Sequence, residues 1–99
     1  MILTICYNDS CESFESILRQ LIEENFSNIT VISYNESFYD EKKKAFKIKG
    51  GYSARMTPFV LLTEDDKKYI KVFYSEDNSC TIDNIIKFIK SINNESTSN

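Results

Sequence analysis

The sequence predicts one α/β domain with the element order β-α-β-α-β-β-α, in which a mixed four-stranded sheet carries helices on both faces. Three observations support this prediction. Two segments have amphipathic helical spacing, four short runs are apolar and β-prone, and the chain of 99 residues is long enough for one domain. We expect the domain to cover residues 1–92 and residues 93–99 to form a polar, frayed tail.

The first third of the chain predicts a strand, a helix and a second strand. Residues 2–7 form an unbroken apolar run, which is typical of a strand buried on both faces. Residues 8–10 (NDS) end the strand and supply N-cap side chains. Apolar residues then recur at helical spacing as far as Asn25, and residues 28–34 form a second β-prone run. The two strands should be parallel, joined by a right-handed crossover.

The remaining elements follow from similar patterns. Residues 36–47 are polar with four apolar anchors, Phe38, Tyr39, Ala45 and Phe46, and we predict a second helix there that ends before Gly50-Gly51. Pro58 opens a third strand, residues 59–63. A short polar turn joins it to a fourth strand, residues 68–75, so these two strands should be antiparallel. Isoleucines at helical spacing predict a final helix over residues 82–92.

Composition narrows the classes of function. The net charge of −3 disfavours a nucleic-acid partner. No stretch is long and apolar enough to span a bilayer, and the N-terminus lacks signal-peptide features, so we expect a cytoplasmic protein without a membrane partner. Three cysteines and no histidine match neither a disulfide framework nor a zinc site. The abundance of Ile, Asn, Lys and Ser suggests an AT-rich genome, such as that of a phage.

Two short segments resemble the active-site segments of the thioredoxin-like superfamily, and small glutaredoxins in particular. In residues 7–14 (YNDSCESF), Cys11 stands where the first strand gives way to the first helix and follows Tyr7 by a few residues. Residues 55–60 (RMTPFV) resemble the segment that holds the cis-proline of the family. A weaker match is residues 79–83 (SCTID), at the start of the last helix. As topology, the resemblance extends over residues 2–92.

The resemblance implies roles for individual residues. Cys11 is the expected nucleophile, and Tyr7 is an expected substrate-binding residue. Thr57 and Pro58, joined by a cis bond, are expected to present backbone to the substrate. Thr81 and Asp83 are the nearest candidates for binding one end of glutathione. The resemblance implies glutathione as a co-substrate, no tightly bound cofactor and no metal.

The sequence departs from the family at the second cysteine of the Cys-x-x-Cys motif, where Phe14 stands. A resolving thiol within the motif is therefore missing, and only a monothiol route remains. The N-terminus of a helix favours a Cys11 thiolate, whereas the nearby charges of Asp9 and Glu12 disfavour it. Cys11 is thus either a nucleophile or simply a small residue at a helix start. The paired glycines that precede the last helix in glutaredoxins are also missing.

The other two cysteines have their own alternatives. Cys6 should point into the core as a small hydrophobic residue. Cys80 is either a resolving thiol for Cys11 or a partly buried packing residue.

Two functions remain open. The first is thiol–disulfide exchange through Cys11 on protein or glutathione mixed disulfides. The second is a redox-inactive binding or assembly module, because a fold is often kept as a binding module after its catalytic activity is lost. The sequence leaves the oligomeric state open.

Overall fold

The architecture comes from a computed structural model, which describes residues 1–43, 45–47, 56–64 and 68–97. A four-stranded sheet has the spatial order β2-β1-β5-β6. Its strands are β1 (Ile2–Cys6), β2 (Thr30–Tyr34), β5 (Phe59–Glu64) and β6 (Lys68–Tyr74). The helices are α1 (Glu12–Asn25) and α2 (Ile82–Thr97), with short 3-10 helices η1 (Asp9–Cys11) and η2 (Glu36–Phe38). A two-stranded hairpin consists of β3 (Tyr39–Asp40) and β4 (Ala45–Phe46).

The sheet is mixed, as the sequence predicts. β1 runs parallel to β2, while β5 is antiparallel to both β1 and β6. β1 and β5 are the two inner strands, and residues 3–6 of β1 are all buried. This burial on both faces explains why that segment reads as an unbroken apolar run.

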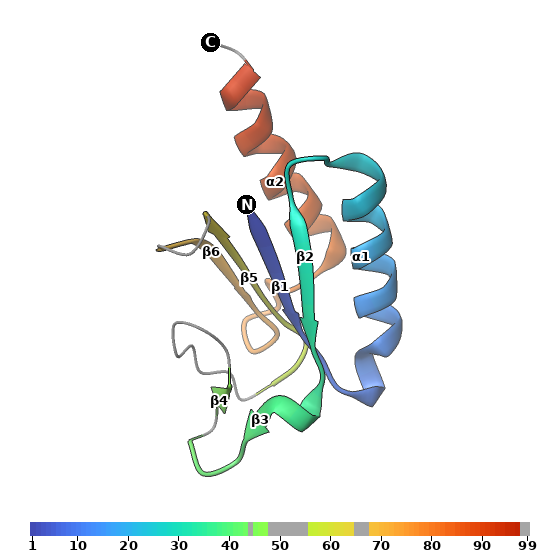
Figure 1. The fold of residues 1–99 in the computed structure, drawn as a ribbon, viewed down its shortest axis with the longest axis vertical. Coiled ribbons are helices and arrows are strands. Elements are labelled where there is room, and N and C mark those ends of the chain that lie inside the picture. The colour runs from blue at the N-terminus through green and yellow to red at the C-terminus, as the bar shows by residue number, and fades with distance from the viewer. Residues whose placement is uncertain (44, 48–55, 65–67, 98–99) are drawn as a thin grey trace.

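One face of the sheet packs against both helices (Figure 1). Because side chains alternate along a strand, Leu3 and Ile5 lie on this face opposite Leu62 and Val60. All four are fully buried. α1 and α2 add their own fully buried side chains to the same cluster: Leu18, Ile22, Ile85 and Ile89.

The opposite face is covered by the β3–β4 hairpin, so the prediction of helices on both faces is wrong for the described residues. Cys6, Phe59 and Leu61 point to this side and pack with Phe46 of β4. In Figure 1 the hairpin lies well away from α1 and α2. The sheet is therefore sandwiched between two helices and a short hairpin.

The second helix, predicted over residues 36–47, is replaced by η2 and the hairpin. The Asn35 side chain accepts a hydrogen bond from the Ser37 N–H (2.9 Å) and caps the 3-10 turn. The Asp40 carboxylate accepts the backbone N–H groups of Lys42 (3.0 Å) and Lys43 (3.3 Å), which bends the chain into a turn. The predicted break at Gly50-Gly51 lies outside the described residues.

The other predicted elements are confirmed, with one change at the end of the chain. α2 continues through Thr97, so the prediction of a frayed tail is wrong for residues 93–97. Residues 98–99 lie outside the described part of the chain. A hydrogen-bonded group fixes α1 to β2, because the buried Glu15 carboxylate accepts bonds from Arg19 Nε (2.8 Å) and Ser33 Oγ (2.6 Å). Among the described residues, no helix is long and apolar enough to cross a membrane.

Candidate functional site

Cys11 lies where β1 hands over to α1, as the sequence predicts. Asn8 adopts an extended conformation and caps η1, accepting the Ser10 N–H at 2.9 Å. Cys11 ends this 3-10 turn and serves as the N-cap residue of α1. The polar run after β1 therefore turns the chain sharply and holds Cys11 at the carboxyl end of an inner strand.

The sulfur of Cys11 is held by Asn8 and stays partly exposed. The Asn8 backbone N–H donates to Cys11 Sγ at 3.2 Å, while the Cys11 N–H donates to the Asn8 carbonyl at 3.0 Å. The thiol in turn lies 3.5 Å from the Asn8 carbonyl oxygen. The Cys11 side chain makes no capping bond to α1, and the residue as a whole is half-buried.

Thr57 and Pro58 lead into β5 at the same end of the sheet. Their peptide bond is cis, as the resemblance to glutaredoxins implies. Phe59 pairs with Cys6 at the end of β1, and the Pro58 carbonyl accepts the Ser75 hydroxyl at 2.6 Å. The Thr57 backbone makes no hydrogen bond within the described chain, so its N–H and carbonyl can pair with a substrate.

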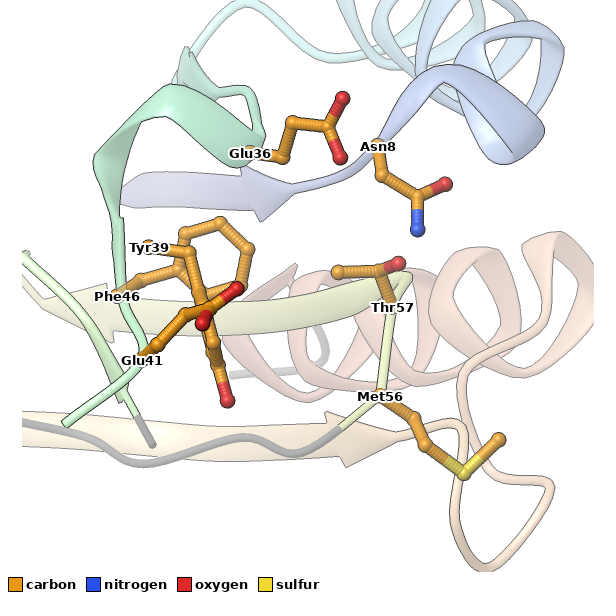
Figure 2. A pocket seen from close by; sticks show the side chains of 7 residues that line it. All are labelled: Asn8, Glu36, Tyr39, Glu41, Phe46, Met56 and Thr57. Carbon is orange, nitrogen blue, oxygen red and sulfur yellow. The ribbon is translucent and has the colours of Figure 1, made fainter. Parts of the chain in front are cut away.

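A cavity of about 410 Å³ opens between these segments and the hairpin. Figure 2 shows Asn8 and Thr57 facing one another on one side and the ring of Tyr39 close to Phe46 on the other. The described residues that line it are Asn8, Glu36, Tyr39, Glu41, Phe46, Met56 and Thr57. Cys11 does not itself line the cavity, but it is connected to it through Asn8, which lines the cavity and whose backbone N–H donates to the Cys11 sulfur.

Cys6 and Cys80 are buried free thiols. Burial raises the pKa of Cys6 to about 12, with repulsion from Cys80 adding to the effect. Burial also raises the pKa of Cys80 to about 12; repulsion from Cys11 and Asp77 adds to it, and a hydrogen bond with the Val60 backbone opposes it. Both thiols are therefore protonated near neutral pH. The predicted core position of Cys6 is confirmed.

Tyr7, Thr81 and Asp83 do not line the cavity. The Tyr7 N–H donates to the Tyr34 carbonyl at 2.9 Å, which extends the pairing of β1 with β2. Thr81 is exposed, and its hydroxyl caps α2 by accepting the Asn84 N–H at 3.2 Å. Asp83 is exposed in the first turn of α2. The structure thus gives Tyr7 and Thr81 structural roles that the sequence did not predict.

Comparison with known proteins adds no relative: no protein-family model, curated protein or solved structure matches this chain. Within the described residues, no three His, Cys, Asp or Glu side chains are grouped so as to hold a metal ion. The chemistry of the site must therefore be inferred from its own residues.

The structure places Cys11 and the Thr57–Pro58 bond at the same end of the sheet, since Cys6 pairs with Phe59, and it adds a cavity wall that the sequence did not predict. That wall comes from η2, β3 and the turn after it, all within the segment predicted as a helix. The available signal was the spacing of Tyr39 and Phe46. Residues seven apart share a helix face, but they also meet across a hairpin, as they do here.

Proposed function

We propose that this chain is a glutaredoxin-like thiol–disulfide exchange protein of the monothiol type, with Cys11 as its nucleophile. The observation that carries the proposal is the placement of Cys11: it is partly exposed, it accepts the N–H of Asn8, and Asn8 lines a cavity together with Thr57, whose bond to Pro58 is cis. The sheet order β2-β1-β5-β6, with both helices on one face, is compatible with a thioredoxin-like fold.

The reaction needs two exchange steps. The Cys11 thiolate attacks one sulfur of a substrate disulfide, forming a mixed disulfide with Cys11 and releasing the other sulfur as a thiolate, which takes up a proton. A thiolate from an external thiol then attacks the substrate sulfur of the mixed disulfide and releases the Cys11 thiolate. One substrate sulfur thus leaves as a thiol, and the other ends in a disulfide with the external thiol, which supplies the two electrons.

Thr57 supports substrate binding in this scheme. Thr57 lines the cavity, and its backbone N–H and carbonyl make no hydrogen bond within the described residues, so they are free to hydrogen-bond the backbone of a peptide disulfide. An external thiol completes the cycle because the buried Cys80 remains protonated near neutral pH and Phe14 replaces the usual second cysteine.

The test is exchange with hydroxyethyl disulfide, followed by intact-protein mass spectrometry. We expect a mixed disulfide on Cys11 that forms several times faster than on a peptide of residues 7–14, and that added glutathione or dithiothreitol releases. Cys11→Ser should abolish the adduct, while Cys80→Ala should retain both formation and release. Formation no faster than in the peptide would overturn the proposal.

A second candidate is a redox-inactive binding module. It is favoured by the buried state of both remaining thiols, since neither is poised to resolve a disulfide. This candidate predicts that Cys11→Ser leaves partner binding intact and that folding confers no advantage in exchange.

A further inference from the structure

The cavity beside Thr57 has a negative wall. Glu36 and Glu41 both line it, whereas no Lys or Arg belongs to its described lining. Neither carboxylate has a hydrogen bond or ion pair within the part of the chain that the structure describes. Two charges that are not neutralised thus border one hollow, so a positively charged group entering it would be attracted by both.

The rest of the wall suits the stem of a long cationic side chain. Tyr39 and Phe46 pack edge to face with ring centroids 5.2 Å apart, and Met56 adds a flexible apolar side chain. Aromatic faces attract cations, and apolar walls accommodate the methylene groups of Lys and Arg. In Figure 2, Glu36 extends beside Asn8, which links the negative wall to the residue that holds the Cys11 sulfur.

The lysines next to Glu41 do not cancel this charge at the cavity. Lys42 and Lys43 are exposed and belong to the turn whose backbone is bound by the Asp40 carboxylate, and neither lines the hollow. Among the described lining residues, the charge is therefore that of Glu36 and Glu41, in a chain whose net charge is itself −3.

We propose that this cavity selects peptide disulfides in which a Lys or Arg side chain lies next to the cysteine that reacts with Cys11. This inference rests on the proposed function and specifies its substrate class. When the substrate backbone lies against Thr57, the cationic side chain enters the hollow between Glu36, Glu41 and the aromatic rings. Anionic disulfides, including oxidised glutathione, are disfavoured as substrates because their carboxylates face like charges.

The kinetic test compares three symmetrical peptide disulfides made from acetyl-Gly-X-Cys-amide, in which X is Lys, Gln or Glu. Rates with the protein are divided by the rates with dithiothreitol, which removes intrinsic differences between the disulfides. We expect the Lys peptide to react about five- to tenfold faster than the Glu peptide at low salt, with a smaller ratio at high salt. In the Glu36→Gln/Glu41→Gln variant, the protein should lose this preference, so that its Lys-to-Glu rate ratio before normalisation approaches the ratio measured with dithiothreitol.

The matched control removes the same charge elsewhere. Glu23 and Glu24 are exposed near the end of α1 and do not line the cavity, so Glu23→Gln/Glu24→Gln should keep the preference for the Lys peptide. Circular dichroism of both double variants verifies that they are folded.

A second measurement separates binding from exchange. In Cys11→Ser, NMR amide shifts of residues 8, 36 and 57 should move with the reduced Lys peptide and stay still with the Glu peptide. Exchange without charge preference would overturn the cation-selective cavity while leaving the proposed function standing. No exchange with any peptide, together with selective shifts, would overturn the proposed function and support the cavity. No exchange and no selective shift would overturn both.

Discussion

The two faces of the β2-β1-β5-β6 sheet are covered by different kinds of structure. On one face α1 and α2 bury Leu18, Ile22, Ile85 and Ile89 against the strands. On the other, a hairpin with only two residues in each strand covers the sheet through Phe46. The helical face contains most of the buried apolar side chains, whereas the hairpin face borders the cavity that Asn8 and Thr57 line. We therefore expect stability and specificity to depend on opposite sides of one sheet.

The largest effect is expected on the helical face. Ile85 of α2 is fully buried, so Ile85→Ala should lower the free energy of unfolding by about 2–5 kcal/mol, because it leaves a cavity between the helix and the sheet. Urea denaturation measures the loss. Ile17→Ala is the control, since Ile17 on α1 is 49% exposed and its truncation should have little effect. Equal losses in the two variants would show that the helical face is not the main source of stability.

A pH effect should follow from the two buried thiols, one on each face. Both folded pKa values are raised from 9.0 to about 12, so the contribution to stability is complete below about pH 9. Above that pH the unfolded chain loses protons that the folded chain keeps, and stability falls. We expect a loss of about 2–3 kcal/mol between pH 8 and 10.

Urea denaturation across this pH range checks the effect. In the Cys6→Ala/Cys80→Ala variant, the free energy of unfolding should depend clearly less on pH. The variant lacks the two buried thiols, and its other titrating groups are those of the wild type. An identical slope in both proteins would mean that the thiols ionise equally well in the folded and unfolded chains.

The hairpin face should give the smallest change in stability and a clear change in selectivity. Phe46→Ala should cost about 1–2 kcal/mol in urea denaturation, because the short hairpin can detach while the helical face stays folded. The same variant should lose the preference for the Lys peptide over the Glu peptide. Phe38→Ala is the control, since Phe38 is 43% exposed and does not line the cavity. A loss as large as that of Ile85→Ala would contradict the contrast between the two faces.

The same contrast explains which parts of the structure could be predicted from the sequence. The helical face is encoded by repeated spacing, as in Leu18 and Ile22, which only a helix brings to one side. Cys11, Thr57 and Pro58 could be predicted because residues 7–14 and 55–60 resemble active-site segments of glutaredoxins. The hairpin was not predicted because its turn depends on hydrogen bonds between side chains and the backbone, such as those of Asp40. In a polar segment such bonds compete with helix formation. The cavity wall was missed with it.

Iodoacetamide labelling at neutral pH, followed by site-resolved mass spectrometry, compares the reactivity of the three thiols directly. We expect Cys11 to be labelled in the native protein, whereas Cys6 and Cys80 should be labelled only in urea, because both are buried and protonated. Labelling of Cys80 or Cys6 as fast as Cys11, or native Cys11 that reacts more slowly than the peptide of residues 7–14, would contradict the assignment of Cys11 as the reactive group.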